Sequence, residues 1–241
     1  MFKPITTLLL LIISLSALAD TSWEAQEVLL QLQELRSEVN RLKQDVAELK
    51  QQGVQPKGAL PALDFQPAHL NVGSNKSGWV IMEFSDYQCR FCKDFVQKSF
   101  DTLKAQLIDS GRVSYHWYGY LLNPQGKSRK AMLASHCVAE QGSVWTYRKH
   151  LYQQGLRKLD VLEQVAAQMQ LDQNAFKRCL RSERYAQQLQ QEQDYAEYLG
   201  ISVTPSFIVG QVENGQLTNY RTLTGIQTAE TFTQALQQLG M

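Results

Sequence analysis

Two cysteines separated by two residues are the side chains of this sequence best suited to chemistry. They occur as Cys89-Arg90-Phe91-Cys92, where the apolar, strand-favouring run 78–84 is followed by apolar residues at helical spacing. Cys89 would therefore lie at a helix N-terminus, where free backbone N–H groups and the helix dipole stabilise a thiolate. Cys92, one turn later, is within bonding reach and could resolve a mixed disulfide. The nearby positive charge of Arg90 should lower the pKa of Cys89 further.

The alternative is that the pair forms half of a zinc-binding ribbon, but zinc would require a second CxxC or paired histidines nearby. The other two cysteines, Cys137 and Cys179, are 42 positions apart, and neither belongs to such a pair. The four histidines are scattered singly and are predicted to be packing or surface residues: His69, His116, His136 and His150. We therefore predict redox chemistry at the CxxC pair, with no metal and no cofactor.

The composition is that of an ordinary globular protein with balanced charge. Of 241 residues, 44% are hydrophobic and 20% are charged, which excludes wholesale disorder, collagen and a multi-span membrane protein. Lys and Arg number 24 and Asp and Glu 23, so the net charge is +1. This balance gives no general attraction to nucleic acid or anionic lipid, and no nucleic-acid partner is expected.

Residues 1–19 have the pattern of a secretory signal peptide. Lys3 gives a positive start, the run 8–13 is apolar, and Ala17 to Ala19 is a small-x-small cleavage site. The alternative, an N-terminal membrane anchor, is disfavoured because the apolar stretch is shorter than the roughly 20 residues of a spanning helix. We expect cleavage before Asp20 and a soluble protein exported to the periplasm, where its cysteines meet an oxidising environment.

Residues 20–52 are predicted to form a coiled-coil oligomerisation helix. Spacings of three and four alternate between apolar residues, which gives an a/d seam: Ala25, Val28, Leu32, Leu35, Val39, Leu42, Val46 and Leu49. Opposite charges at g and the following e, such as Glu38 and Lys43, favour a parallel homodimer through residues 23–52, with a trimer left open. The alternative is a single amphipathic helix that folds back on its own domain. Residues 53–61, with two Gly and two Pro, are predicted to be a linker.

Two motifs resemble those of the DsbA-like thiol–disulfide oxidoreductases, secreted bacterial members of the thioredoxin superfamily. The string Phe84 to Cys92 (FSDYQCRFC) resembles the strand–turn–helix of their active site, and Gly200 to Phe207 (GISVTPSF) resembles the segment where they place a cis-proline facing the sulfurs. The helix-rich stretch between the motifs resembles their helical insertion. The likeness runs from about Leu70 to Leu239. The coiled coil lies outside the DsbA pattern and is similar to the oligomerising N-terminal regions of DsbC, DsbG and ScsC-type proteins.

The resemblance implies an α/β, thioredoxin-like fold over residues 62–241, with a helical insertion at about 127–199. Sequence periodicity agrees with this fold. It predicts a strand over 113–118 and helices over 129–140, 144–153, 161–169, 174–180 and 185–199. After Pro205 it predicts a strand that ends at 209–210, a turn at 213–215, a strand near 220–223 and a helix over 228–239.

The resemblance also assigns catalytic roles. Cys89 would be the attacking cysteine and Cys92 the resolving one. Glu83 lies in the middle of the strand before them, so it would be buried with a raised pKa, and the matching acid of the family helps to move the proton of the resolving cysteine. The alternative is a solvent-facing Glu on an edge strand.

Further roles concern the substrate and a second disulfide. Thr204, before a cis Pro205, would offer its backbone to an extended substrate, which Arg90 and Phe91 would also contact. Phe91 stands where DsbA itself has a histidine, so that source of thiolate stabilisation is missing. Some DsbA-like proteins carry a second, non-catalytic disulfide at similar positions, so we expect a bond between the remaining cysteines, Cys137 and Cys179. The alternative is two buried free thiols.

The sequence therefore predicts an exported enzyme that exchanges protein disulfides through Cys89 and Cys92. An oligomer with several active sites around a shared space favours a disulfide isomerase or reductase. Its partners would be unfolded or misoxidised exported proteins and a membrane redox partner. A DsbA-type thiol oxidase is the alternative enzyme. Two further alternatives are a copper-binding or metal-stress protein that uses the same CxxC, and an oligomeric scaffold in which the CxxC is idle.

Overall fold

The computed structural model describes residues 26–41, 43, 62–74, 76 and 78–241. The chain divides into two compact units, Met1–Gly58 and Ala59–Met241, and each is described by itself. The predicted signal peptide (1–19) and the predicted linker (53–61) lie outside the described residues. In the described part, no helix has both the length and the apolar character that crossing a membrane requires.

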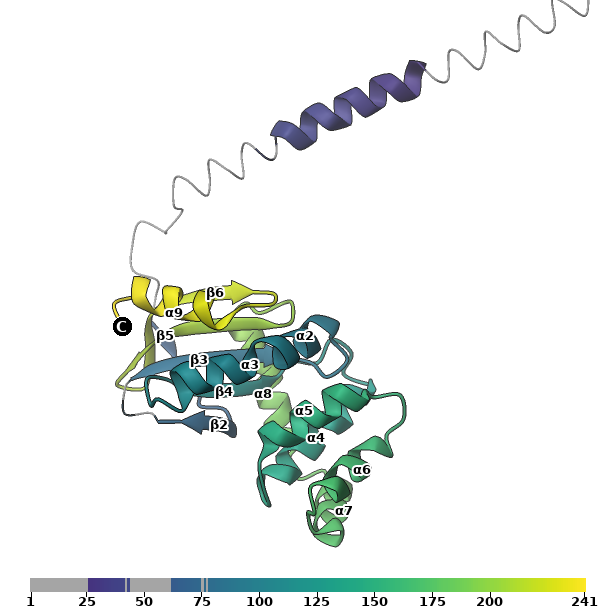
Figure 1. Cartoon of the computed structure of the whole chain (residues 1–241), viewed down its shortest axis with the longest axis vertical. Coiled ribbons are helices and arrows are strands. Elements are labelled where there is room, and N and C mark those ends of the chain that lie inside the picture. The colour runs from purple at the N-terminus through teal and green to yellow at the C-terminus, as the bar shows by residue number, and fades with distance from the viewer. Residues whose placement is uncertain (1–25, 42, 44–61, 75, 77) are drawn as a thin grey trace, which may run out of the picture. The chain divides into compact units, whose positions relative to one another are not determined.

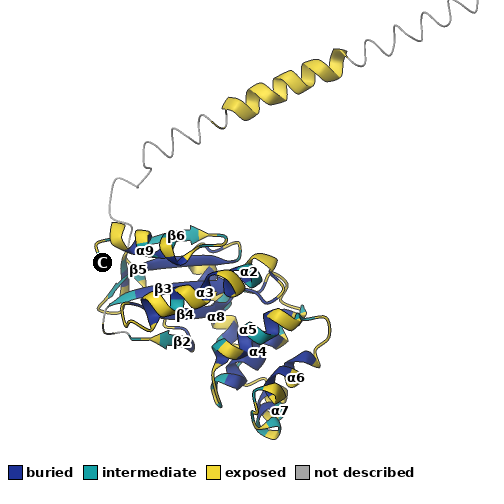
Figure 2. Cartoon of the chain, viewed as in Figure 1, coloured by how far each residue is buried: buried dark blue, intermediate teal, exposed yellow. Residues whose placement is uncertain are grey.

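The described part of the first unit is a helix over residues 26–41 and 43, as the heptad pattern predicts. Each of residues 26–41 is exposed (Figure 2). Four side chains of the predicted seam, Val28, Leu32, Leu35 and Val39, keep between 44% and 62% of their surface open to solvent. A short isolated helix is marginal in water, so this one would gain stability if its apolar stripe were buried against another surface. The oligomer that would supply that surface remains a prediction.

A six-stranded sheet forms the centre of the second unit (Figure 1). Its spatial order is β1-β6-β5-β3-β4-β2, with the bounds β1 Leu63–Asp64, β2 Leu70–Gly73, β3 Trp79–Ser85, β4 Ser114–Gly119, β5 Ser206–Glu213 and β6 Gln216–Thr224. β3 and β4 are parallel, and the other neighbouring strands are antiparallel. The register of β3 and β5 pairs Phe84 with Ser206. The end of β3 that leads to Cys89 therefore lies beside the start of β5, next to Pro205.

Helices cover both faces of the sheet. Side chains alternate along a strand, so Ile81 of β3 joins one apolar cluster while Val80 and Met82 join another. The first cluster contains residues of α2 (Arg90–Lys98), α3 (Phe100–Leu103) and α9 (Ala229–Gln238), and the second contains residues of α8 (Ala186–Tyr198). Burial on both faces explains why the sequence of β3 is almost continuously apolar.

The chain between β4 and β5 forms the helical insertion. Besides α8 it contains α4 (Lys127–Ala139), α5 (Val144–Gln154), α6 (Val161–Gln168) and α7 (Gln173–Ser182). Helices α4 to α7 gather in a lobe beyond one end of the sheet (Figure 1). A disulfide joins Cys137 of α4 to Cys179 of α7, with their Cα atoms 5.8 Å apart, and only 1% of the surface of each cysteine is exposed.

The strand after Pro205 continues to Glu213, so the expectation that it ends at Gly210 was wrong. Gly210 lies inside β5, where the register with β6 shifts. A Cβ atom at this position would come within 2.5 Å of Tyr220. The glycine therefore marks a bulge and a close approach of two strands, which are the usual reasons for glycine within a strand.

Two other features differ from the predicted elements. The helix that follows the cysteine pair is interrupted: α2 ends at Lys98, Ser99 has a non-helical φ of −123°, and α3 continues into a π-helical turn, η2 (Lys104–Ile108). The edge strands β1 and β2 were not predicted, because segments of two and four residues are too short to show a period.

Two histidines that were predicted to be isolated meet in the structure. The Nδ1 atoms of His69 and His136 lie 3.1 Å apart, and Nε2 of His136 lies 3.6 Å from Oε1 of Glu192. Burial lowers the pKa of His136 to about 3 and raises the pKa of Glu192 to about 8. Both groups are therefore mostly uncharged at neutral pH, and they pack the segment before β2 against α4 and α8.

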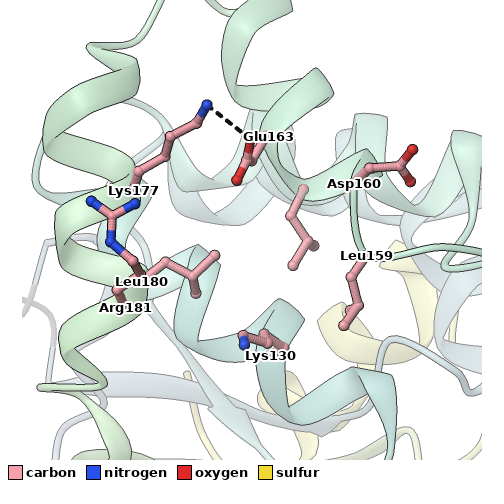
Figure 3. Close-up of a pocket in the computed structure, with 8 residues that line it drawn as sticks. Lys130, Leu159, Asp160, Glu163, Lys177, Leu180 and Arg181 are labelled. Carbon is pink, nitrogen blue, oxygen red and sulfur yellow. Dashed lines mark ion pairs between the residues drawn. The ribbon is translucent and has the colours of Figure 1, made fainter.

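A surface pocket of about 350 Å³ lies on the insertion, between residues of α4, α6 and α7 (Figure 3). Three leucines and five charged residues line it: Leu159, Leu162, Leu180, Lys130, Asp160, Glu163, Lys177 and Arg181. Glu163 and Lys177 form an ion pair at 3.0 Å. The lining includes neither cysteine of the CxxC pair nor the Thr204-Pro205 segment, so this pocket is not the site of the thiol chemistry.

Replacing Cys137 and Cys179 by alanine should lower the free energy of unfolding by about 4 kcal/mol. The reason is that the bond joins residues separated by 42 positions and restricts the unfolded chain. Urea denaturation of the wild type and of the double variant, both with the CxxC pair intact, measures the difference. Equal unfolding midpoints would contradict the expectation.

Candidate active site

Cys89 caps the N-terminus of α2. Its backbone is extended, with φ −74° and ψ 119°, and its Sγ accepts a hydrogen bond from the backbone N–H of Cys92 at 3.3 Å. The sulfur thus does what a Ser or Asp side chain does at many helix starts, where the first N–H groups have no partner within the helix. The N–H of Cys89 donates to the carbonyl oxygen of Asp86 at 3.1 Å and closes the turn between β3 and α2.

These surroundings lower the pKa of Cys89 to about 6. The largest contribution is the hydrogen bond with the side chain of Cys92. Burial opposes it, whereas the backbone of Cys92 and Phe91 adds to it. Most of Cys89 is therefore thiolate at neutral pH, the form that attacks disulfides. Arg90 is exposed and is not among the main contributions, so the expected effect of its charge on Cys89 is not found.

Cys92 has the opposite character. It has no exposed surface, whereas Cys89 keeps 7% of its surface open. Burial, and then the hydrogen bond with Cys89, raise the pKa of Cys92 far above its ordinary range. Cys92 is therefore a protonated thiol that donates to the neighbouring thiolate. This asymmetry suits an attacking Cys89 and a resolving Cys92.

The peptide bond between Thr204 and Pro205 is cis. The carbonyl oxygen of Thr204 lies 3.4 Å from Sγ of Cys89, although the two residues are 115 positions apart in the chain. The pairing of β3 with β5 brings them together. An extended peptide that forms hydrogen bonds with the Thr204 backbone would pass directly beside the reactive sulfur.

Four exposed apolar side chains belong to the segments that meet here, and we call them the apolar rim: Phe91, Leu122, Val203 and Ile226. Their exposed fractions are 57%, 56%, 48% and 39%, respectively. Phe91 and Val203 are close in sequence to Cys89 and Thr204. The N–H of Leu122 donates to Asp86 at 2.9 Å, and Ile226 follows Gly225, whose N–H donates to the carbonyl oxygen of Pro205 at 2.8 Å. Exposed apolar groups beside a reactive centre indicate a surface for a partly apolar ligand.

Glu83 is fully buried on a central strand, which excludes the edge-strand alternative. Its Oε2 accepts from Nη1 of Arg148 at 2.8 Å, its Oε1 accepts from Nη2 of the same residue, and the hydroxyl of Tyr115 also donates to Oε2. Its burial is as predicted, and a buried cation, Arg148, balances its charge. In the described part of the chain, no hydrogen bond links Glu83 to Cys92. The part of Glu83 in moving the Cys92 proton stays a prediction.

Arg148 is the partner that the sequence analysis missed. It lies in α5 of the insertion, 4.2 Å from the ring of Trp117, and its Nη2 also donates to Oγ of Ser85 at 3.3 Å. A signal was available, since Arg148 shares a buried helical stripe with Val144 and Leu151. A charge at such a position needs a buried partner of opposite charge.

Asp86 is a second missed residue. Only 1% of its surface is exposed, and its carboxylate accepts hydrogen bonds from the N–H of Gln88 at 2.6 Å, the N–H of Leu122 at 2.9 Å and the hydroxyl of Ser128. The signal for it was an acid placed between a buried strand and the reactive pair. Two of its partners, Leu122 and Ser128, come from distant segments, and no local pattern indicates them.

The two thiols are also the groups of the site that could hold a soft metal such as Cu(I). Across the residues that the structure describes, no three His, Cys, Asp or Glu side chains are gathered as a metal site would require. Within the described part of the chain, the geometry thus offers thiol chemistry and supplies no third ligand beside the pair.

The sequence profile of the thioredoxin family, described simply as thioredoxin, matches residues 66–233. The chain belongs to the thioredoxin family. This thioredoxin-family chain is 26% identical to disulfide bond formation protein D of Bacillus subtilis, over 66% of this chain and 74% of that protein. It is also 28% identical to the Na(+)/H(+) antiporter NhaA 3 of Salinispora tropica, over 57% of this chain but 21% of that protein. The chain spans about a fifth of the antiporter's length, so nothing about ion transport follows.

Solved structures agree on the fold. The DsbA of Chlamydia trachomatis superposes with a TM-score of 0.60 at 19% identity, over 76% of this chain and 96% of that one. The expected α/β thioredoxin-like fold with a helical insertion, and the resemblance to DsbA-like proteins, are therefore confirmed. The coiled coil and the oligomer stay predictions.

The alkylation rate of Cys89 should rise with pH through a midpoint of about 6. In Cys92→Ala the midpoint should move upward, because the hydrogen bond that contributes most to the thiolate is lost. Timed reaction with iodoacetamide followed by mass spectrometry gives each midpoint. An unchanged midpoint in Cys92→Ala would show that another group stabilises the thiolate.

Arg148→Met should lower the free energy of unfolding by about 3–5 kcal/mol, because Glu83 would be left as an unbalanced buried charge. The double variant Glu83→Gln/Arg148→Met should be more stable than Arg148→Met alone. Lys149→Met is the matched control, since the neighbouring Lys149 pairs with Asp101 on the surface. It should lower the free energy of unfolding by less than about 1 kcal/mol. Urea denaturation monitored by circular dichroism tests all three, and equal losses for Arg148→Met and Lys149→Met would contradict the expectation.

Proposed function

We propose that this protein is a periplasmic thiol–disulfide oxidoreductase that acts on the disulfides of exported proteins, as an oligomer suited to isomerisation and reduction. One observation carries the proposal: a thiolate-forming Cys89, paired with the buried thiol of Cys92, lies against the Thr204–Pro205 cis peptide. The name of the Bacillus subtilis relative, disulfide bond formation protein D, supports the same class of reaction.

The exchange begins when the Cys89 thiolate attacks one sulfur of a substrate disulfide. A bond forms between Cys89 and that sulfur, the substrate S–S bond breaks, and the other substrate sulfur leaves as a thiolate. If another substrate thiolate attacks the mixed disulfide, Cys89 is released as thiolate and the substrate is isomerised with no net redox change. If Cys92 attacks Sγ of Cys89, the substrate leaves as a dithiol, and the enzyme holds the Cys89–Cys92 disulfide and has given up two electrons.

The character of Cys92 supports the first of these routes. Cys92 must lose its proton before it attacks, and its burial opposes that loss. Both oxygens of the nearby Glu83 are engaged by Arg148 and Tyr115. Slow resolution leaves time for the substrate to rearrange while it is bound to Cys89.

The substrate class follows from the surface beside the sulfur. The apolar rim favours polypeptide segments that expose apolar side chains, as unfolded or misoxidised proteins do. Thr204 would pair with the backbone of such a segment, Pro205 would keep that backbone beside Sγ, and Arg90 and Phe91 would contact its side chains. Recognition through the backbone and apolar contacts tolerates many sequences, as a general disulfide enzyme requires.

The exposed helix supports the oligomer. Its seam of Val28, Leu32, Leu35 and Val39 is the feature that a parallel dimer or trimer would bury. Two or more reactive thiolates around one substrate are suited to correcting wrong disulfides. The signal pattern at 1–19 supports export to the periplasm, where a membrane redox partner would reset the Cys89–Cys92 pair.

A DsbA-type oxidase is the second candidate. The observation in its favour is the lowered pKa of Cys89, because a stabilised thiolate favours the reduced enzyme and makes its disulfide a stronger oxidant. Such an enzyme would transfer its disulfide to reduced substrates and be reoxidised by the membrane partner.

Recovery of a scrambled-disulfide enzyme in a glutathione buffer tests the proposal. The chain beginning at Asp20 should restore activity, and a chain beginning at Gly58, which lacks the helix, should restore several-fold less, because it presents a single site. Recovery by neither form, together with fast oxidation of a reduced peptide, would establish the oxidase. Cys89→Ser with undiminished activity in both assays would reject both enzymes.

Two point variants separate assembly from loss of the segment. Leu35→Glu places a charge in the seam, whereas Leu30→Glu places one on the opposite side of the same helix, and both leucines are exposed. Leu35→Glu should reduce both the mass measured by light scattering and the isomerase rate. Leu30→Glu should change neither.

A further inference from the structure

The Asp86 carboxylate is buried without a cation. Its surface is 1% exposed, and among the described residues no ion pair involves it. A buried charge is costly unless hydrogen bonds replace its hydration. The N–H groups of Gln88 and Leu122 and the hydroxyl of Ser128 do so here. A neutral side chain at this position would avoid the cost of burying a charge. The contacts of the Asp86 carboxylate therefore indicate that it has a role.

These contacts tie the reactive turn to the insertion. Ser128 is in the first turn of α4, and the next residue of the reactive turn, Tyr87, forms a hydrogen bond of 2.6 Å between its hydroxyl and that of Ser135, two turns along α4. Tyr152 of α5 donates its hydroxyl to the carbonyl oxygen of Asp86 at 3.1 Å. Helices α4 and α5 thus hold the turn through several buried polar contacts.

The same residue contacts the backbone of Cys89 and of the apolar rim. The carbonyl oxygen of Asp86 accepts from the N–H of Cys89, and its carboxylate fixes the N–H of Gln88 one residue earlier. Oδ2 holds the N–H of Leu122, a member of the rim. A displacement of Asp86 would therefore move both the sulfur that reacts and a side chain that contacts the substrate.

We propose that Asp86 is a positioning residue, whose carboxylate locks the turn carrying Cys89 against helix α4 of the insertion and so sets the reactivity of Cys89 and the place of Leu122. The inference rests on the proposed thiol–disulfide function. It makes the insertion part of the reactive machinery, because Ser128 is one of the groups that hold the carboxylate.

The direction in which the pKa of Cys89 shifts in Asp86→Asn distinguishes a positioning role of Asp86 from a simple charge effect. In Asp86→Asn a negative charge near Cys89 disappears, which alone would favour the thiolate and lower the pKa of Cys89. If the hydrogen bonds of the carboxylate are lost instead, the turn whose N–H groups stabilise the thiolate becomes looser. This change raises the pKa of Cys89. A rise from about 6 to about 7 would reduce the thiolate fraction at pH 6, and with it the alkylation rate, about fivefold.

The experiment compares the alkylation rate of Cys89 and the reduction potential against glutathione in three variants of the full chain. Asp86→Asn should react about fivefold more slowly at pH 6 and become more reducing. Ser128→Ala, which removes one hydrogen bond and no charge, should change both quantities in the same direction but by less. Asp94→Asn is the control, since it removes an acid of α2 that pairs with Lys98 on the surface, and it should leave both quantities nearly unchanged.

Several results would overturn the inference. They are faster alkylation in Asp86→Asn, equal effects of Asp86→Asn and Asp94→Asn, or an unchanged rate in Ser128→Ala. Ser128→Ala also decides the matter if Asp86→Asn fails to fold, which circular dichroism would reveal. A wild-type chain that forms no mixed disulfide with a disulfide-bonded peptide would instead overturn the proposed function, while the thiolate measurements would still decide the role of Asp86.

Discussion

The chemistry of this protein depends on where one sulfur atom is held. Cys89 Sγ lies at the start of α2, so that an N–H of the first helical turn and the thiol of Cys92 both stabilise its negative charge. None of these groups is itself a cation. The thiolate is favoured by oriented dipoles and hydrogen bonds, which act only if the turn, the helix and the cis-proline loop keep their relative positions.

The sheet and the insertion together hold the turn, the helix and the cis-proline loop in their relative positions. The pairing of β3 with β5 places the Thr204 carbonyl beside the sulfur, and the ion pair of Glu83 with Arg148 fastens α5 beneath the same strand. Replacing a well-made buried ion pair by apolar residues often costs little, whereas removing one partner costs much. The pair therefore need not add to net stability, although it links α5 of the insertion to the central strand.

The parts of the site that lie close together in sequence could be predicted, and the parts that depend on long-range contacts could not. The CxxC pair at a helix start and Thr204-Pro205 before a strand were both visible as local patterns. Burial of Glu83 followed from its place in an apolar strand, but its partner Arg148 lies 65 positions away, and nothing in the strand indicated it. The strand after Pro205 was predicted to end at Gly210, although it continues to Glu213. In a sequence, a glycine that permits close packing of two strands cannot be told from a glycine that ends a strand.

The same reasoning applies to the elements of the chain. Helices with a clear period were predicted within a few residues, whereas β1 and β2 are defined by the strands they pair with and have no period of their own. The heptads predicted the helix at 26–41, because a repeat is a local property. How many chains meet along its seam depends on a balance of side-chain shapes that one sequence does not fix.

The Cys137–Cys179 disulfide and the Cys89–Cys92 pair are two sets of sulfur atoms that do not exchange with each other. Cys137 and Cys179 are each 1% exposed, inside the packing between α4 and α7, whereas Cys89 lies at the edge of the folded core. Exchange requires a thiolate to approach a disulfide along its axis, and burial denies that approach to the protein's own thiolate and to that of a second copy. The disulfide of the insertion is thus shielded from thiol–disulfide exchange with Cys89. We therefore expect the Cys137–Cys179 bond to stay intact while Cys89 and Cys92 exchange disulfides.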